Sequence, residues 1–322
     1  MRVPREERGA ALLTVLLLVA VMATVAATAL DRIGVGTRFL ANAASIAQAR
    51  SWLDMAEQLA GTRIEDLLAA DASQTTLAAG LLGAERSIDL PDGSVAKVRI
   101  DDGGNCFNLN SLVQRLQDGR MIARPFAARQ FTALMESLGI APGDAATIAA
   151  SATDYVDPDS VPLPGGSEDG EAGPSANHLI AHASELRLVP NVTDRHYQLL
   201  ERWICALPVA ELSPINVNTL LAEQAPLVAM LVPGQIDVTR ARSQIAARPA
   251  DGYGSVLNFW QTPVMAGLEV PPEAAEQIKV RTGFFILRAR VSAGDLEVAE
   301  TALFDARLAP VRLLHRQWGQ SS

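Results

Sequence analysis

The stretch that decides the fold of this chain is residues 8–30, which read RGAALLTVLLLVAVMATVAATAL. From Ala10 to Leu30 no residue is charged, and about 20 consecutive apolar residues are enough for a helix to span a bilayer. Several arginines precede this run, and basic residues beside a membrane helix tend to stay in the cytoplasm. The sequence therefore predicts one membrane helix, with everything after Asp31 outside the cytoplasm.

The helix is expected to continue beyond the membrane. Residues 38–70 contain no proline, and their apolar residues recur at helical spacing, namely at Phe39, Ala43, Ile46, Leu53, Ala56, Ala60, Ile64 and Leu67. A cleaved secretory signal is the alternative, since residues 23–27 resemble a small-residue cleavage site. A membrane helix that runs into an amphipathic helix is, however, a stalk and not a removable signal.

Gly34 and Gly36 lie where the helix would leave the membrane. Each glycine inside a helix costs roughly 1 kcal/mol relative to alanine. The sequence therefore indicates either a bendable point or a short irregular break here.

Composition limits the function classes. The chain has 322 residues, a net charge of −9 and 49% apolar residues, enough for one large domain or two modest ones. The acidic balance argues against a nucleic-acid partner, because phosphate binding needs clustered Lys and Arg.

Strand signals bracket a long helical region. Residues 86–90 and 94–101 read as strands around the turn Pro91-Asp92-Gly93, and further strands are expected over residues 284–291, 297–308 and 311–315. Residues 71–83 read as a loop with a short helical piece, and the pattern from Asn105 to about Lys279 is helical. We therefore predict an α+β fold: a long N-terminal helix, an antiparallel sheet closed from distant segments, and a large all-α insertion.

A short motif occurs twice inside the insertion. Residues 107–112 read FNLNSL and residues 215–220 read INVNTL. Each is an extended segment leading into a helix, whose N-cap would be the second asparagine or the hydroxyl residue. The repeat predicts two related helical subdomains, 105–207 and 208–279, although a chance match of loose residue classes is the alternative.

The second subdomain resembles a helix-hairpin-helix or SAM-like unit. Such units bind DNA through a Gly-apolar-Gly hairpin, whereas residues 232–237 read VPGQID. This hairpin lacks the second glycine and ends in an acid. We therefore expect the fold without the DNA function.

One loop is rich in acids and contains Pro and Gly. No Lys or Arg occurs between Arg129 and Arg187, and the acids are Asp154, Asp157, Asp159, Glu168, Asp169 and Glu171. Crowded carboxylates repel one another unless they are solvated or bridged by a cation, and calcium accepts 6–8 oxygen ligands at flexible geometry. Composition alone leaves two readings open, a solvated loop with helix caps and a calcium site.

Catalytic readings find little support. Paired carboxylates can hydrolyse glycosides, but these lie on one loop without evident pocket aromatics. His178, His182 and Glu185 have helical spacing for zinc, yet no HExxH pattern accompanies them. Nucleophile-elbow, P-loop and Rossmann patterns do not occur in the sequence. We expect a protein that is not an enzyme.

Cys106 and Cys205 are the only cysteines in the sequence, and both follow the membrane segment. In an exported domain two cysteines are expected to form one disulfide, with two buried free thiols as the alternative.

The N-terminus resembles a known family signal. Arg8-Gly9 followed directly by an apolar helix is similar to the class III leader of type IV pilins and pseudopilins. The resemblance implies cleavage between Gly9 and Ala10 and methylation of the new N-terminus. Most pilin-like subunits carry glutamate at the fifth mature position, which is Thr14 here.

That departure is characteristic of one family, the minor pseudopilin K of type II secretion. Four collinear segments resemble it: CFNLN (106–110), SELRLV (184–189), CALP (205–208) and INVNT (215–219). The implied division is leader 1–9, membrane helix 10–30, stalk helix and first strands 31–104, insertion 105–279 and C-terminal strands 280–322.

The resemblance also implies ligands and partners. It favours bound Ca²⁺ in the acidic loop, with Asp157, Asp159, Glu168 and Asp169 as first candidates and Asp154 and Glu171 as weaker ones. Ala172 departs from the family, which usually has an aromatic residue there. The family is anchored in the inner membrane by a single pass, with its C-terminal domain in the periplasm.

The implied role is assembly at the tip of the pseudopilus, with minor pseudopilins I and J as partners. The exported substrates and the secretin are further candidate partners. The apolar stripe from Phe39 to Leu67 is expected to pack against partner stalk helices. The alternative function is a membrane-tethered binding module for DNA or an envelope ligand.

Overall fold

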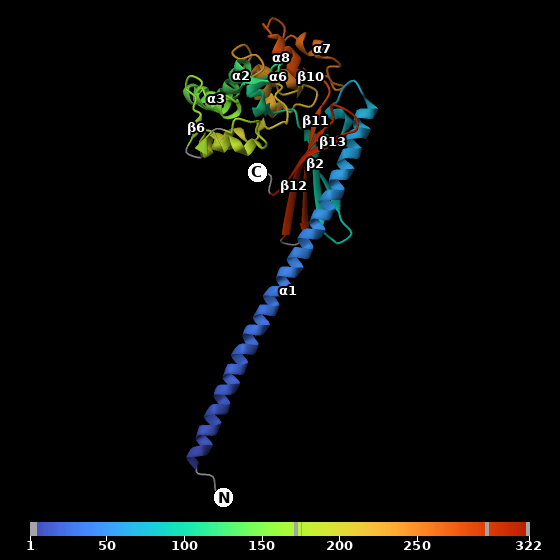
Figure 1. Ribbon diagram of the computed structural model, residues 1–322. Helices are drawn as coiled ribbons and strands as arrows, with labels where there is room; N and C mark the ends of the chain where they lie inside the picture. Colours follow the sequence, from blue (N-terminus) through green and yellow to red (C-terminus); the bar gives the residue numbers. More distant parts are fainter. Residues whose placement is uncertain (1–4, 171–172, 175, 294–295, 320–322) are drawn as a thin grey trace.

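A single long helix forms the N-terminal part of the protein (Figure 1). The computed structural model describes residues 5–170, 173–174, 176–293 and 296–319, and helix α1 spans Arg5–Ala70. It continues through Gly34 and Gly36, so of the two readings the short irregular break is wrong. A cost of roughly 1 kcal/mol per glycine is small beside the hydrogen bonds of a 66-residue helix.

The headgroup is built on a five-stranded antiparallel sheet with the order β1-β2-β11-β12-β13. The strands are β1 (Arg86–Asp89), β2 (Val95–Asp102), β11 (Phe284–Ala293), β12 (Leu296–Asp305) and β13 (Arg312–Trp318). All five predicted strands are confirmed. β12 ends earlier than expected because the Asp305 carboxylate accepts the N–H of Arg307 and starts a turn.

Helix α1 packs its C-terminal part on one face of this sheet. Ala49, Leu53, Ala60 and Ile64 are buried in one core cluster with residues of β2, β11 and β12. Leu53, Ala60 and Ile64 belong to the stripe expected to contact partner helices, and that expectation is wrong for them. The protein's own sheet covers them, whereas Phe39 further down the helix is exposed.

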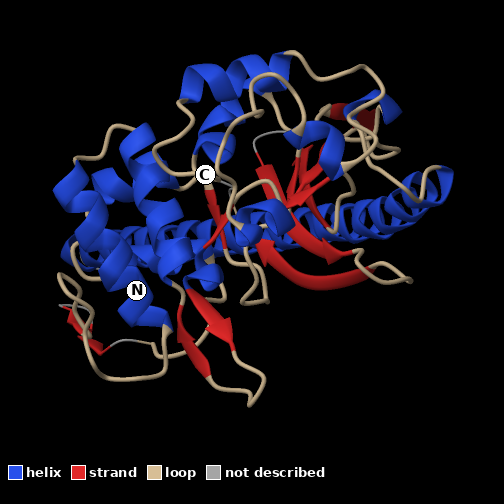
Figure 2. Cartoon of the chain, turned by 90° about the horizontal axis from the view of Figure 1, so that it is seen from above, coloured by secondary structure: helices blue, strands red, loops and turns tan. Residues whose placement is uncertain are grey.

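The predicted insertion lies between β2 and β11, and helices make up most of its regular secondary structure (Figure 2). Its helices are α2 (Pro125–Ser137), α3 (Pro142–Val156), α4 (Asp194–Leu200), α5 (Ala225–Ala229), α6 (Val238–Ala246), α7 (Val256–Trp260) and α8 (Pro272–Gln277). One continuous cluster of buried residues runs from Phe107 to Ile278. The two related parts therefore share a core.

The repeated motif has the same geometry in both copies. Strand β3 (Phe107–Asn108) pairs in parallel with β8 (Ile204–Cys205), and β9 (Ile215–Asn216) pairs in parallel with β10 (Ile278–Lys279). In each copy the first asparagine caps the following turn: Oδ1 of Asn108 accepts the N–H of Asn110, and Oδ1 of Asn216 that of Asn218. The expectation that the second asparagine or the hydroxyl caps is therefore wrong.

The second asparagine instead binds a distant segment. Asn110 Nδ2 donates to the carbonyls of Ile180 and Leu207, at 2.8 Å each. Asn218 Oδ1 accepts the N–H of Tyr253 at 2.8 Å. An amide can donate and accept at once, so each asparagine satisfies buried backbone groups that would otherwise be unpaired.

The predicted disulfide is present. Cys106 and Cys205 are bonded, with 5.8 Å between their Cα atoms and a sequence separation of 99. The bond joins the start of the insertion to its middle, next to the paired strands β3 and β8.

Candidate metal centre and assembly surfaces

The acidic loop gathers carboxylates from both of its ends. Asp154 lies in the last turn of α3, Asp157 caps the end of that helix, and Glu168 lies just before strand β6 (Asp169–Gly170). Asp157, Asp159 and Glu168 each offer an oxygen, and these oxygens lie within 4.8 Å of one another.

Two of these carboxylates are buried with unsatisfied oxygens. Oδ1 of Asp154 accepts the N–H of Leu163 at 2.9 Å. Within the described chain, Oδ2 of Asp154 and Oδ1 of Asp157 accept no hydrogen bond. Buried polar atoms are normally paired. A hard cation prefers oxygen ligands, and these two oxygen atoms could both coordinate one.

Burial and like charges change the ionisation of this loop. Burial is the main cause that raises the pKa of Asp157 to about 7, and the charges of Asp159, Asp154 and Glu168 add to it. Burial also raises the pKa of Asp154. Crowding of this kind favours protons or a cation in the loop.

Gly166 completes this site, and sequence reasoning missed it. A Cβ atom there would lie 2.0 Å from Oδ2 of Asp154, so only glycine lets the loop close over that carboxylate. The pair Gly165-Gly166 inside an acidic loop was the signal that could have identified it.

The structure gives less information on the other two predicted ligands, Asp169 and Glu171. The backbone of Asp169 pairs in β6 with β7 (Gly173–Pro174). Glu171 and Ala172 lie outside the described residues. The structure therefore brings together Asp154, Asp157, Asp159 and Glu168 from the predicted set.

Two of the three residues considered for zinc, His182 and Glu185, make other contacts. Oε1 of Glu185 accepts the N–H groups of Ala181 and His182 at 2.8 Å, capping the short 3-10 helix Ala183–Leu188. The ring of His182 lies edge-on to His315, 5.1 Å away between centroids. Neither histidine belongs to the metal cluster found in the described residues.

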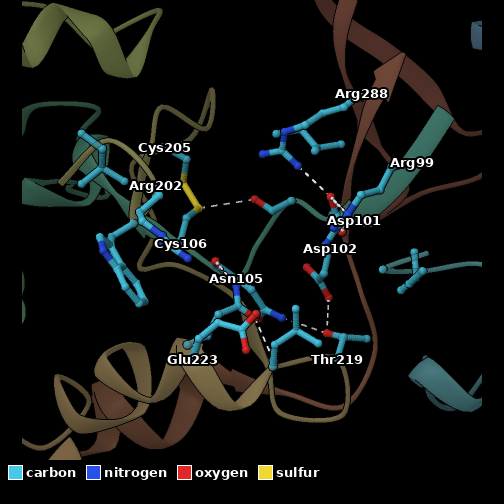
Figure 3. Close-up of a pocket in the computed structure, with 18 of the residues that line it drawn as sticks. Arg99, Asp101, Asp102, Asn105, Cys106, Arg202, Cys205, Thr219, Glu223 and Arg288 are labelled. Atoms are coloured by element: carbon cyan, nitrogen blue, oxygen red, sulfur yellow. Dashed lines mark hydrogen bonds and ion pairs between the residues drawn. A yellow bond between two sulfur atoms is a disulfide. The ribbon is translucent and has the colours of Figure 1, made fainter. Parts of the chain in front are cut away.

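A cleft of about 390 Å³ separates the insertion from the sheet (Figure 3). On its sheet side, Asp101 bridges Arg99 and Arg288, at 2.8 and 2.7 Å. Deeper in, the Asp102 carboxylate accepts hydrogen bonds from Thr219, Thr282 and the N–H of Gly104. Burial raises the pKa of Asp102 to about 6. Asp101 therefore links two strands of the sheet, whereas Asp102 joins the sheet to the insertion through Thr219.

The membrane-facing part of α1 has the properties of an anchor. It contains a segment long and apolar enough to cross a membrane, and its leucines from Leu12 to Leu18 are exposed. An apolar helix followed by a stalk, with the upper stalk packed on an antiparallel sheet, is the architecture of a pilin-like subunit, and the apolar helix is a candidate membrane anchor.

Comparison with known proteins identifies the family. Two models described as "Type II secretion system (T2SS), protein K" match residues 105–209 and 215–281. Type II secretion system protein K of Klebsiella pneumoniae is 31% identical over 320 residues, covering 98% of this chain and 97% of the relative. That of Pectobacterium carotovorum subsp. carotovorum is 30% identical over 328 residues, covering 98% and 97%. The chain belongs to the type II secretion system protein K family.

A solved structure agrees with this assignment. One chain of the GspK-GspI-GspJ complex from enterotoxigenic Escherichia coli matches with a TM-score of 0.73 and 28% identity. The match covers 86% of this chain and 98% of that one. The predicted resemblance and α+β fold are confirmed, and the alternative of a tethered DNA-binding or envelope-binding module is not favoured.

Proposed function

We propose that this chain is a non-catalytic minor pseudopilin that assembles with pseudopilins I and J at the pseudopilus tip. One observation carries the proposal: its fold matches nearly the whole length of a chain solved in a GspK-GspI-GspJ complex. It is anchored in the inner membrane by α1, and its headgroup lies in the periplasm.

The stalk offers a surface for these partners. Met55 and Leu59 are 55% and 49% exposed, one helical turn apart and turned away from the buried residues Leu53 and Ala60. Exposed apolar residues at this spacing suit packing against another helix. Further down, Phe39 and Leu40 are also exposed.

The shape of the headgroup favours the tip. The insertion stands beside the upper end of the sheet (Figure 1), and repeated in every layer of a narrow filament it would clash with its neighbours. Thr14 also lacks the carboxylate that most pilin-like subunits bury in the membrane. An ionised group there is costly unless paired, so its absence removes one constraint on neighbouring subunits.

Assembly is tested by co-purification. The chain without residues 1–30 is mixed with pseudopilins I and J and examined by light scattering. We expect a one-to-one-to-one complex. A monomer that stays separate at micromolar concentration, or labelling along the filament shaft, would contradict the tip role.

Processing is proposed to occur between Gly9 and Ala10, followed by methylation of the new N-terminus. The support is the position of Gly9 directly before the apolar run. Mass spectrometry of the mature protein should give a chain that begins at Ala10 with one added methyl group. An N-terminus between residues 26 and 30 would indicate an ordinary signal peptide instead.

The acidic loop is proposed to hold structural calcium. Asp157, Asp159 and Glu168 are the main ligands, with Asp154, Asp169 and Glu171 as further candidates. The unsatisfied oxygens of Asp154 and Asp157 support this proposal. The ion would neutralise the crowded carboxylates, so the headgroup gains stability with calcium by mass action.

Two glycine variants test this calcium site. Gly166→Ala places a methyl group on Asp154 and should abolish the rise in melting temperature on moving from chelator to millimolar calcium. Gly143→Ala is the matched control, since a Cβ there meets nothing within 4 Å. A melting temperature that is unaffected by calcium in the unmodified protein would rule out the site.

A further inference from the structure

Glu300 is a buried carboxylate in the middle of β12, on the sheet face that α1 covers. Its side chain is 0% exposed, and in the described part of the chain neither of its oxygens accepts a hydrogen bond. The nearest cation is Arg316, whose Nε lies 3.5 Å from Oε1. A buried charge with so little compensation is costly.

Arg316 is shared with two other acids. From β13 its guanidinium donates two hydrogen bonds of 2.7 Å to Glu57 of α1, and its Nη1 lies 2.9 Å from Asp54 Oδ1. Three carboxylates thus surround one guanidinium. If all three were ionised, the cluster would keep an excess of two negative charges at the contact between stalk and sheet.

The other elements packed around Glu300 do not supply the missing charge. On β11 the residue paired with it is Ala289, and Leu287 and Val291 on the same face are also apolar. On β13 the paired residue is Trp318. The guanidinium of Arg50 from α1 lies over the Trp318 ring, 5.5 Å from its centroid, and no ion pair of the described residues joins Arg50 to Glu300.

We infer that Glu300 is a proton-operated latch between the stalk helix and the headgroup sheet. With a proton, Glu300 is neutral and can donate a hydrogen bond to Glu57, so the cluster holds α1 against β12 and β13. Without the proton, like charges of Glu57, Asp54 and Glu300 face one another in a buried seam, and the contact weakens.

The direction of the pH effect follows from the environment of Glu300. Burial, followed by the neighbouring Glu57 carboxyl, raises the pKa of Glu300 to about 7, against 4.5 for an ordinary glutamate. A group that binds its proton more tightly in the folded state stabilises that state most at low pH. This stabilisation is complete below the unfolded pKa and is lost as pH rises through about 7.

Hydrogen exchange of the full-length protein in detergent micelles with saturating calcium tests the latch. Protection of backbone amides from exchange is measured from pH 5.5 to 8 in peptides from residues 49–60 and from β13. The rates are corrected for the pH dependence of intrinsic exchange. We expect protection there to fall by roughly tenfold or more across this range. Glu300→Gln, which cannot ionise, should remove this dependence, and Glu297→Gln at an exposed site of β12 should keep it.

A second variant keeps the test decisive if Glu300→Gln folds poorly. Asp54→Asn removes one like charge from the cluster and should move the midpoint of the transition to lower pH. Asp102 and Asp157 also titrate in this range, but they are common to all variants and lie in other peptides. Protection that stays constant with pH, or a midpoint that Asp54→Asn leaves unmoved, would overturn the latch.

Discussion

At the scale of single residues, Asn108 and Asn216 organise the two halves of the insertion. Both side chains are fully buried. Asn108 accepts the N–H of Leu207 and donates to the carbonyls of Val209 and Glu211. Asn216 donates to the carbonyl of Thr75 and to the Thr282 hydroxyl. Each asparagine therefore ties its own turn to a segment far away in sequence.

Replacing either asparagine should be costly. Asn108→Ala and Asn216→Ala leave buried backbone groups unpaired, and each is expected to lower the free energy of unfolding by roughly 2–4 kcal/mol. Asn42→Ala, at an exposed position of α1, should change it by no more than about 0.5 kcal/mol. Urea unfolding measures all three, and equal effects for Asn42 and Asn108 would contradict the assignment.

Asp102 is expected to make stability depend on pH. Its pKa is raised from 3.8 to about 6, so its contribution to stability is greatest below about pH 4 and falls as pH rises through about 6. Asp102→Asn cannot ionise. As pH rises through this window, its free energy of unfolding should increase relative to that of the unmodified protein by on the order of 2–3 kcal/mol.

Urea unfolding at several pH values, with calcium saturating, checks the Asp102 prediction. Asp89→Asn, at an exposed site of β1, is the control and should follow the unmodified protein. A constant difference between Asp102→Asn and the unmodified protein from pH 4 to 7 would show that Asp102 does not titrate in this range.

At the scale of the elements, the two sides of α1 differ in what they contact. One side is buried on the sheet through Leu53 and Ile64, and the other exposes Met55 and Leu59. Met55→Glu places a charge on the exposed side only. We expect an unchanged melting temperature and at least roughly tenfold weaker assembly with pseudopilins I and J, since a charge in a helix contact is costly unless paired.

Asn42→Glu is the control for Met55→Glu. It adds the same charge at an exposed position of α1, away from the side that carries Met55. It should assemble normally in pull-down or light-scattering experiments. If both variants bind partners as tightly as the unmodified chain, Met55 is not part of the interface.

Sequence reasoning worked best where the signal was local. The apolar run from Ala10, the turn at Pro91-Asp92-Gly93 and the repeated asparagine motif each lie within one short window. The stripe on α1 was real, but a pattern of apolar residues does not say which surface covers it. Here the sheet is formed by strands from both ends of the chain.

The missed features depend on contacts between distant segments. The cluster of Glu57, Glu300 and Arg316 requires the exact register of β12 with β13, and a slip of one residue would turn Glu300 to the other face. Gly166 matters only because the loop closes over Asp154. Neither relation has a periodic signal in the sequence.

At the scale of the whole molecule, the disulfide fixes the insertion. Cys106 and Cys205 close a loop of 99 residues, for which the chain-entropy model gives roughly 4–5 kcal/mol, an upper figure because residual structure reduces it. The double variant Cys106→Ala/Cys205→Ala should therefore melt at a clearly lower temperature.

The unmodified protein under reducing conditions provides a second measure of the same bond. Its melting temperature should fall toward that of the double variant, while the variant itself should not respond to reductant. Free thiols that react with an alkylating agent in unreduced native protein would show that the bond does not form.

The connection between sheet and insertion has a mechanical consequence. The N–H of Gly103 donates to the carbonyl of Phe284 at 2.8 Å, so the chain leaves the sheet and returns to it at neighbouring points on β2 and β11. A thrust applied along the stalk passes from α1 into the sheet through their shared core. The insertion is joined to the sheet at two adjacent backbone points and is held there by hydrogen bonds from Thr219 to Asp102 and from Asn216 to Thr75, so a push from below would carry it forward together with the sheet.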